Sequence, residues 1–290
     1  MADSPMQMMM RLACRSLLLA ATLLVATDAG AGVRASTSSS DSASKGQDVT
    51  TELAMDGHRL RMDVNDASGQ QPPMTMLFDG SKSELILINH GDKSLTRLDD
   101  KTGQAIRARM EAARRQMAER LKQLPPEQRE MAEKMLSGHL GMAGLDDPKA
   151  RPTPAPVKVT ATGRTESVGG RSCRVFRVRR ADAEPAEICA ESWADAGVTE
   201  KDLLALEQLG EFQTRMVEEV GGQGMPAMHH PFDLFRQVQG IPLRTRQKDG
   251  EGGVRETTFT EIRKADVPES TFDIPAGYSE RQLLPPMPQG

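Results

Sequence analysis

Short apolar segments separated by turn residues fill the first third of the folded part of this sequence and limit what it can form. The Asp56-Gly57 pair is a hairpin-turn signal, and apolar residues recur at every second position from Leu60 to Val64. Three further apolar segments follow at residues 74–78, 85–88 and 95–98, with Asp79-Gly80 and Gly91-Asp92 between them. Alternation with period two and tight turns predict an antiparallel meander of short strands.

A second group of strands is expected after a proline-rich crossover at residues 147–156. Apolar and polar residues alternate from Val157 to Thr160, and the segments 173–178 and 188–190 read as strand partners across a turn. Near the end of the chain, residues 241–247 and 254–262 flank the Gly-rich stretch 249–253 and predict another hairpin.

Helical periodicity appears in two places between these strands. Residues 104–123 carry apolar side chains every three or four positions, and Pro125-Pro126 predicts a second helix over 127–137. A third helix is expected from Thr199, where Asp202 completes a capping pattern, and its apolar stripe reaches Val220. Strands and helices without regular alternation predict an α+β fold with a curled antiparallel sheet, an inserted helical hairpin and a helix on the concave face.

The N-terminus has the order of a secretory signal. Arg11 and Arg15 precede an apolar run over 17–26, and small residues follow at 29–31. We expect a signal peptide at 1–31, cleaved after Ala31 or, as a second choice, after Ala35. A membrane anchor is the alternative, but this run is about half of the roughly 20 residues that a bilayer needs. The Ser-rich stretch then predicts a solvated linker over 32–47, and 281–290 a disordered tail.

Cysteine usage agrees with an exported, periplasmic protein. Only Cys173 and Cys189 remain after the signal, on segments expected to be neighbouring strands, which permits a disulfide between them. Two buried free thiols are the plain alternative. A metal site would require further Cys or His ligands nearby, and the spacing does not supply them.

Composition argues against nucleic-acid binding. The net charge is −4 and aromatic residues make up 3% of the chain, so neither a basic footprint nor a set of stacking side chains is present. One segment differs, because residues 101–123 contain seven basic and two acidic side chains. This expected helix either contacts an anionic membrane surface or an acidic partner, or is simply a solvated helix face.

Several short motifs resemble an uncharacterised group of exported bacterial proteins similar to the outer-membrane lipoprotein carrier, or LolA-like, fold. They are Met55-Asp56-Gly57 with Arg59, Arg61 and Met62; Met76-Leu77-Phe78-Asp79; residues 85–88; Trp193 ahead of a helix; and residues 272–278. The resemblance implies one domain over 48–280 with a helical insertion at 103–145. It also implies an incomplete β-barrel wrapped round a helix, with a hydrophobic cavity for acyl chains.

The resemblance and the strand pattern together indicate a non-catalytic binding or carrier-like protein for an acyl chain, lipid, lipidated protein or similar apolar ligand. Methionine suits such a surface because its side chain is unbranched and polarizable. If the helix from Thr199 fills the concave face completely, the same residues are ordinary core. The candidate lining residues are Leu60, Met62, Met76, Phe78, Leu87, Phe176 and Trp193.

Three other functions are weighed. One segment contains several soft ligands that could bind copper: Met225, Met228, His229 and His230. The alternative is a connecting loop that binds no metal. The helical insertion could instead bind unfolded proteins, as a chaperone does. An enzyme would need acid and base groups drawn from Asp63, His58, His90 and His139, and nothing in their spacing demands it. We therefore expect no enzyme and no cofactor.

Overall fold

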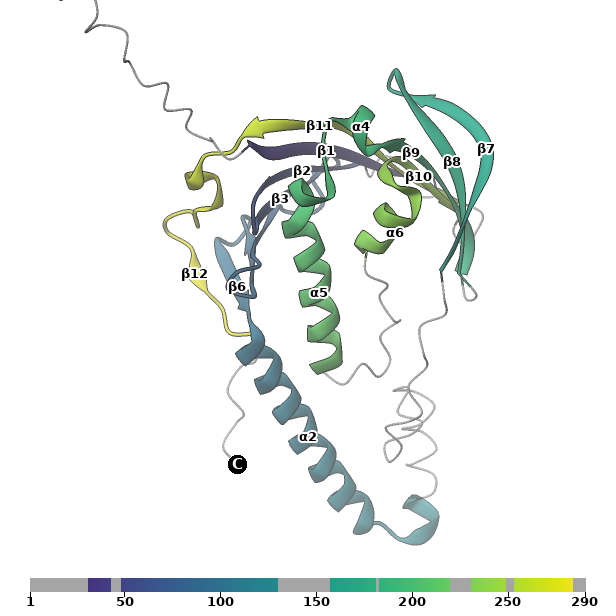
Figure 1. Cartoon of the computed structure of the whole chain (residues 1–290). Helices are drawn as coiled ribbons and strands as arrows, with labels where there is room; N and C mark the ends of the chain where they lie inside the picture. The colour runs from purple at the N-terminus through teal and green to yellow at the C-terminus, as the bar shows by residue number, and fades with distance from the viewer. Residues whose placement is uncertain are drawn as a thin grey trace, which may run out of the picture.

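The computed structural model describes residues 31–42, 48–129, 157–180, 183–219, 231–248 and 253–283. Its described strands form one sheet of 12 strands in the order β12-β6-β5-β4-β3-β2-β1-β11-β10-β9-β8-β7. The sheet curls over the helices without closing (Figure 1). Its strands are β1 (Ala31–Asp41), β2 (Val49–Asp56), β3 (Arg59–Asp66), β4 (Met74–Asp79), β5 (Glu84–Asn89), β6 (Ser94–Leu98), β7 (Lys158–Val168), β8 (Arg171–Arg180), β9 (Ala183–Ser192), β10 (Gly240–Lys248), β11 (Val254–Asp266) and β12 (Ser279–Glu280).

The expected meander is confirmed from β2 to β6. Each of these strands pairs antiparallel with the next, and Gly57, at the predicted turn, has a φ of 57°. A side chain resists that left-handed conformation, so glycine suits the tight connection between β2 and β3. The expected hairpin of β10 and β11 is confirmed as well.

Strand β1 corrects the expected linker. Residues 31–41 lie in the middle of the sheet, where they pair antiparallel with β2 on one side and with β11 on the other. Val33 and Ala35 are almost completely buried, and Ser39 exchanges a hydrogen bond with Thr257 of β11. The Ser-rich composition therefore marks a central strand whose second half lies near the rim, and the fold begins well before residue 48. The expected signal peptide lies outside the described residues, apart from Ala31.

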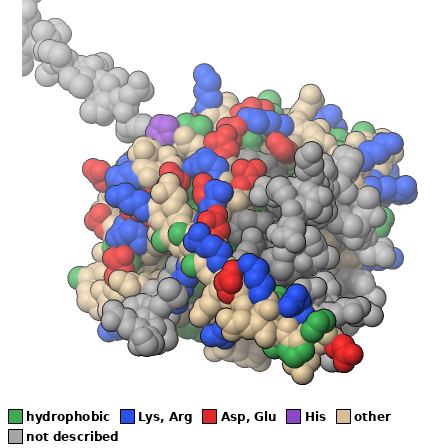
Figure 2. All heavy atoms as spheres, turned by 90° about the horizontal axis from the view of Figure 1, so that it is seen from below, with side chains coloured by type: hydrophobic (Ala, Val, Ile, Leu, Met, Phe, Trp, Pro, Cys, Tyr) green, Lys and Arg blue, Asp and Glu red, His purple; other side chains and the backbone are tan. Residues whose placement is uncertain are grey.

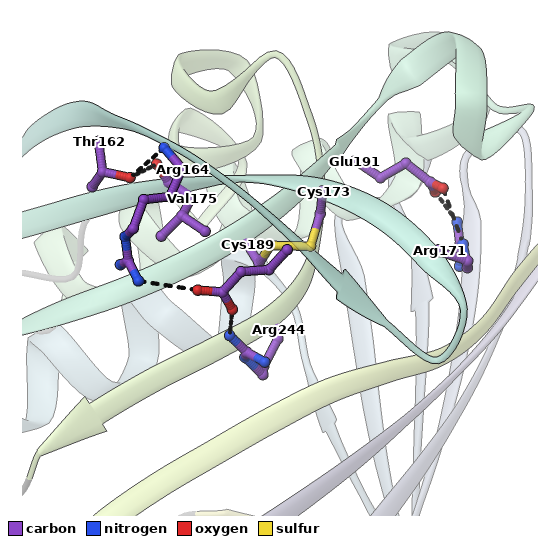
Figure 3. Close-up of a disulfide and its surroundings, with 9 residues drawn as sticks. Thr162, Arg164, Arg171, Cys173, Val175, Cys189, Glu191 and Arg244 are labelled. Atoms are coloured by element: carbon purple, nitrogen blue, oxygen red, sulfur yellow. Dashed lines mark hydrogen bonds and ion pairs between the residues drawn. A yellow bond between two sulfur atoms is a disulfide. The ribbon is translucent and has the colours of Figure 1, made fainter.

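The pairing of β8 with β9 brings the two cysteines together. Cys173 and Cys189 form a disulfide, with their Cα atoms 5.3 Å apart, and both side chains are buried (Figure 3). Around it, Thr162 donates a hydrogen bond to the Val175 carbonyl, and Glu166 bridges Arg164 and Arg244. The expected disulfide is thus confirmed.

Helices cover the concave face of the sheet (Figure 1). The chain passes from β9 through α4 (Trp193–Ala196) and the 3-10 turn η1 (Glu200–Leu203) into α5 (Leu204–Glu219). Thr199 donates its backbone N–H to Asp202, as the capping pattern predicts. A further helix, α6 (Pro231–Val238), replaces part of an expected loop and buries Phe232 and Phe235.

Helix α2 (Asp100–Lys122) confirms the first helix of the insertion, with Asp99 as its N-cap. It packs on α5 only near its start, where the Cβ of any residue replacing Gly103 would lie 3.1 Å from Met216 Sδ. Beyond that contact, α2 extends away from the sheet (Figure 1). Residues 126–129 are helical, and the remainder of the range expected for the second helix lies outside the described residues. Among the helices described, none is long and apolar enough to cross a bilayer.

The C-terminal segment 267–281 runs over the convex face of the sheet. It contains η2 (Glu269–Phe272) and ends with β12, which pairs parallel with β6. Tyr278 packs there against a second apolar cluster of Leu77, Ile86, Ile88 and Leu95. The curled α+β architecture is thus confirmed, with one correction: the sheet is mixed, because β12 is parallel to its neighbour.

Candidate ligand-binding surface on the concave face

The deepest row of concave side chains is sealed. Leu60 pairs across the strands with Met55 on one side and Phe78 on the other, and Phe78 pairs with Leu85. These four residues and Val33 are at most 7% exposed. Helix α5 provides the cover, since the Phe212 ring lies 5.7 Å from that of Phe78. Leu60 and Phe78, two of the expected lining residues, are therefore core.

The next row, two residues along each strand, is only partly covered. Met62 pairs with Met76, and Met76 pairs with Leu87, so three apolar side chains stand side by side on the same face. All three are half-buried and pack against the main core cluster. Their neighbours across β2 and β1, Leu53 and Ala35, are buried. The uncovered part of the row therefore lies over β3, β4 and β5.

Burial falls further in the third row. Val64 is half-buried, and its partner Met74 is 41% exposed. The concave face therefore changes gradually from sealed core to solvent-exposed rim along the strands. We call Met62, Met76 and Leu87 the methionine row. It is an apolar ledge between the core and the mouth of the curled sheet, and its width across three strands suits an extended apolar group.

The main core cluster also carries partly buried hydrophobic residues from other elements that the sequence pattern did not single out as lining. Leu98, Leu206, Met216 and Phe259 are partly buried hydrophobic residues packed on the same cluster. Met216 belongs to the apolar stripe expected for α5, so the signal for it was present in the sequence. The sequence could not predict how α5 is positioned against the rest of the core, and this position decides where Met216 lies.

The two remaining candidates lie elsewhere. Phe176 is buried in a separate cluster with Ile188 and Val238, where β8 and β9 meet α6. Trp193 opens α4 and packs half-buried against the main cluster. Neither side chain belongs to the methionine row.

A polar network occupies the convex face behind the methionine row. Arg61 donates hydrogen bonds of 2.7 and 2.9 Å to Asp63, and Thr75 donates a further one. Burial raises the pKa of Asp63, but hydrogen bonds from Arg61 and Thr75 outweigh this effect, so that the pKa falls below its usual value of 3.8. Asp63 is therefore a carboxylate at neutral pH.

Asp63 and His90, two of the residues considered for acid and base roles, do meet in this network. Thr75 lies between them, 2.8 Å from His90 Nε2, and it is only 1% exposed. His58 instead contacts Gln208 of α5 through a 3.0 Å hydrogen bond. The Asp63–Thr75–His90 chain is thus packed within the protein, an arrangement that supports structure. His139 lies outside the described residues.

The copper ligands considered as an alternative, Met225, Met228, His229 and His230, also lie outside the described residues. Within the described ranges, no group of three or more His, Cys, Asp or Glu side chains is placed to hold a metal ion.

Comparison with known proteins gives likenesses of fold. The chain resembles an uncharacterized conserved protein from Thermus thermophilus, with 7% identity and a TM-score of 0.44, over 87% of this chain and 91% of that one. It also resembles MucB in the MucA/MucB complex of Pseudomonas aeruginosa, with 12% identity, a TM-score of 0.36 and coverage of 86% and 57%. A LolA superfamily protein from Nitrosomonas europaea matches with 10% identity, a TM-score of 0.27 and coverage of 84% and 91%.

The LolA-like resemblance that the sequence motifs indicate is found again among these structures. At such identities the likeness concerns the fold alone. Among curated proteins, no sequence matches this chain. Residues 144–278 match a domain of unknown function, DUF4412, a range that includes β7 to β11 and ends just before β12.

Proposed function

We propose that this is a periplasmic, carrier-like binding protein that holds an acyl chain or a similar extended apolar ligand against the methionine row. The observation that carries the proposal is the burial gradient: α5 seals the deepest row, while Met62, Met76 and Leu87 stay half-buried in direct register. Each methylene that a ligand moves from water onto this ledge contributes about 0.8 kcal/mol. About six to eight methylenes therefore give useful affinity even after the cost of ordering a chain.

Export to the periplasm is supported by two features. The N-terminal sequence has the order of a secretory signal, and the Cys173–Cys189 disulfide persists in oxidising compartments. The proposal involves no catalytic step, because binding on an apolar ledge needs none.

A fluorescent fatty-acid analogue tests the proposal. It should bind the full mature chain with enhanced emission and be displaced by unlabelled palmitate. Met62→Gln and Met76→Gln keep the side-chain volume but add an amide, and together they should weaken binding at least about tenfold, because a ligand would then desolvate polar groups without partners. Met110→Gln is the matched control, since Met110 is 39% exposed on α2, away from the sheet.

The controls decide the outcome. Thermal unfolding followed by circular dichroism must show that the double variant is folded. Equal binding by the wild type, the double variant and the control would refute the ledge as the binding surface, and absence of binding by the folded wild type would refute the proposal.

A second candidate function, protein interaction through α2, is favoured by one observation. Met110 and Met117 are 39% and 36% exposed on the helix that extends from the sheet. Replacing residues 108–144 by a short Gly/Ser linker keeps the Gly103–Met216 contact and the Arg107–Glu219 ion pair at 3.7 Å. An interaction protein would lose its ability to suppress aggregation of an unfolded client, whereas a ligand carrier would keep the fatty-acid analogue.

A further inference from the structure

A hollow of about 490 Å³ opens at the end of the sheet where β8, β9, β10 and β11 meet. It is separate from the methionine row, which lies over β3 to β5. Short side chains help to form it, because Pro185 and Ala186 stand among long basic ones. The lining residues are Arg177, Pro185, Ala186, Glu187, Arg246, Gln247, Lys248 and Val254.

The acidic groups at this hollow are already neutralised. Glu187 pairs with Arg164, and Glu256, beside Arg246 in the sheet register, pairs with Arg246. Glu187 also lies directly opposite Arg177 and Arg246 in the sheet register, so Arg177, Glu187, Arg246 and Glu256 form one row across four strands. Among the described residues of this region, the four cations Arg164, Arg177, Arg246 and Lys248 outnumber the two carboxylates Glu187 and Glu256.

Two lining cations have no such partner. Arg177 and Lys248 are exposed and make no ion pair within the described residues. Next to them, Lys158 and Arg179 stand directly opposite each other on β7 and β8, and both are exposed. Like charges in that position destabilise a sheet, and the described residues of this region therefore carry a local excess of positive charge. Figure 2 shows Lys and Arg side chains along the margin on the side of β7 and β8.

We infer that this hollow binds a phosphate group. Arg177 can form two parallel hydrogen bonds to phosphate oxygens, and Lys248 adds a compact charge on the same hollow. A dianion matches the local excess of two positive charges better than a single carboxylate does. The site differs from the basic helix α2, because its cations converge on a concave surface and its acidic neighbours are held in ion pairs. The inference does not depend on the proposed function.

Two phosphate probes test the inference and distinguish their source. Isothermal titration calorimetry with inorganic pyrophosphate measures a soluble ligand, and co-sedimentation with phosphatidylglycerol vesicles, against phosphatidylcholine vesicles, measures a lipid headgroup. The test variant is Arg177→Gln with Lys248→Gln. Its matched control is Lys93→Gln with Lys201→Gln, which removes the same charge from exposed positions in the β5–β6 turn and in η1.

The expected result is binding of at least one probe by the full mature chain, weakened about tenfold or more by the Arg177/Lys248 pair of substitutions and little changed by the control pair. Binding should also weaken as salt is added. Vesicle binding without pyrophosphate binding identifies the phosphate as a lipid headgroup. Failure of both probes, or equal weakening by both double variants, would overturn the inference, and circular dichroism confirms that each variant is folded.

Discussion

The hydroxyl of Tyr278 lies 2.6 Å from Nδ1 of His90, and the two rings meet edge to face at nearly right angles, with centroids 5.6 Å apart. The two residues are separated by 188 positions in the sequence, so this contact fastens the C-terminal segment to the end of β5. His90 in turn contacts Thr75, which donates to Asp63, and Arg61 donates to the Thr271 carbonyl. The segment is therefore held to the convex face by one connected set of hydrogen bonds.

Tyr278→Phe should destabilise the protein. The ring and its packing remain, but His90 loses a hydrogen-bond partner in a half-buried site, so the free energy of unfolding should fall by roughly 1 to 2 kcal/mol. Urea denaturation of the wild type and the variant measures the difference. An unchanged midpoint would show that the hydroxyl contact contributes nothing to holding the segment.

Asp63 should make stability depend on acid pH. Its pKa in the folded state is lowered, so the stabilisation is complete above the pKa of the unfolded chain and is lost as pH falls through the lower, folded value. Unfolding midpoints measured between about pH 7 and 2 should therefore drop below about pH 4 in the wild type. Asp63→Asn should be less stable at neutral pH and show a shallower fall.

Asp273→Asn is the control for this titration, because Asp273 is exposed in the same C-terminal segment. Its acid profile should follow that of the wild type. If Asp63→Asn and the wild type lose stability in parallel between about pH 5 and 2, the role given to Asp63 is wrong.

Loss of the disulfide should cost about 3 kcal/mol, because the bond closes a loop of 16 positions. Replacing both Cys173 and Cys189 by Ala keeps the buried site apolar. The double variant should unfold at lower urea than the oxidised wild type, and dithiothreitol should bring the wild type down to the same midpoint. A variant as stable as the oxidised wild type would contradict this account.

Gly240 at the start of β10 tolerates no side chain. A Cβ there would lie 1.8 Å from the Glu191 carbonyl oxygen, which belongs to the paired backbone of β9. Gly240→Ala should therefore cost about 2 kcal/mol or more. Gly80→Ala serves as the comparison, because the three atoms nearest to its Cβ would all belong to the side chain of Gln208 and not to backbone. Equal losses of stability in the two variants would mean that the β10 backbone adjusts freely.

The order of the strands on either side of α2 could be predicted from local patterns, whereas β1 could not. Its second half contains serine and threonine where a buried strand is expected to be apolar, so composition indicated a linker. Its place is fixed by non-local pairing with β2 and with β11, the latter far away in the sequence. Helix α6 was missed for a similar reason: its eight residues are too few for periodicity to stand out, and its burial depends on β10.

Part of the candidate surface could also be predicted from the sequence. The expected curled sheet placed Leu60, Met62, Met76, Phe78 and Leu87 on its concave face, and the structure does bring them together. Alternation cannot say how far along each strand α5 reaches, so it could not separate the sealed Leu60 and Phe78 from the half-buried methionine row. For Phe176 it could not show that α6 covers that part of the sheet.

The central claim is tested most directly by native mass spectrometry of the mature protein. The protein is purified from the bacterial envelope without detergent, because detergent would displace an apolar ligand. The account predicts a population carrying an added mass that organic extraction recovers as an acyl-chain compound, and that is depleted in the Met62→Gln/Met76→Gln double variant but retained in Met110→Gln. A folded wild-type protein that shows only its own mass, and that takes up no added palmitate, would contradict it.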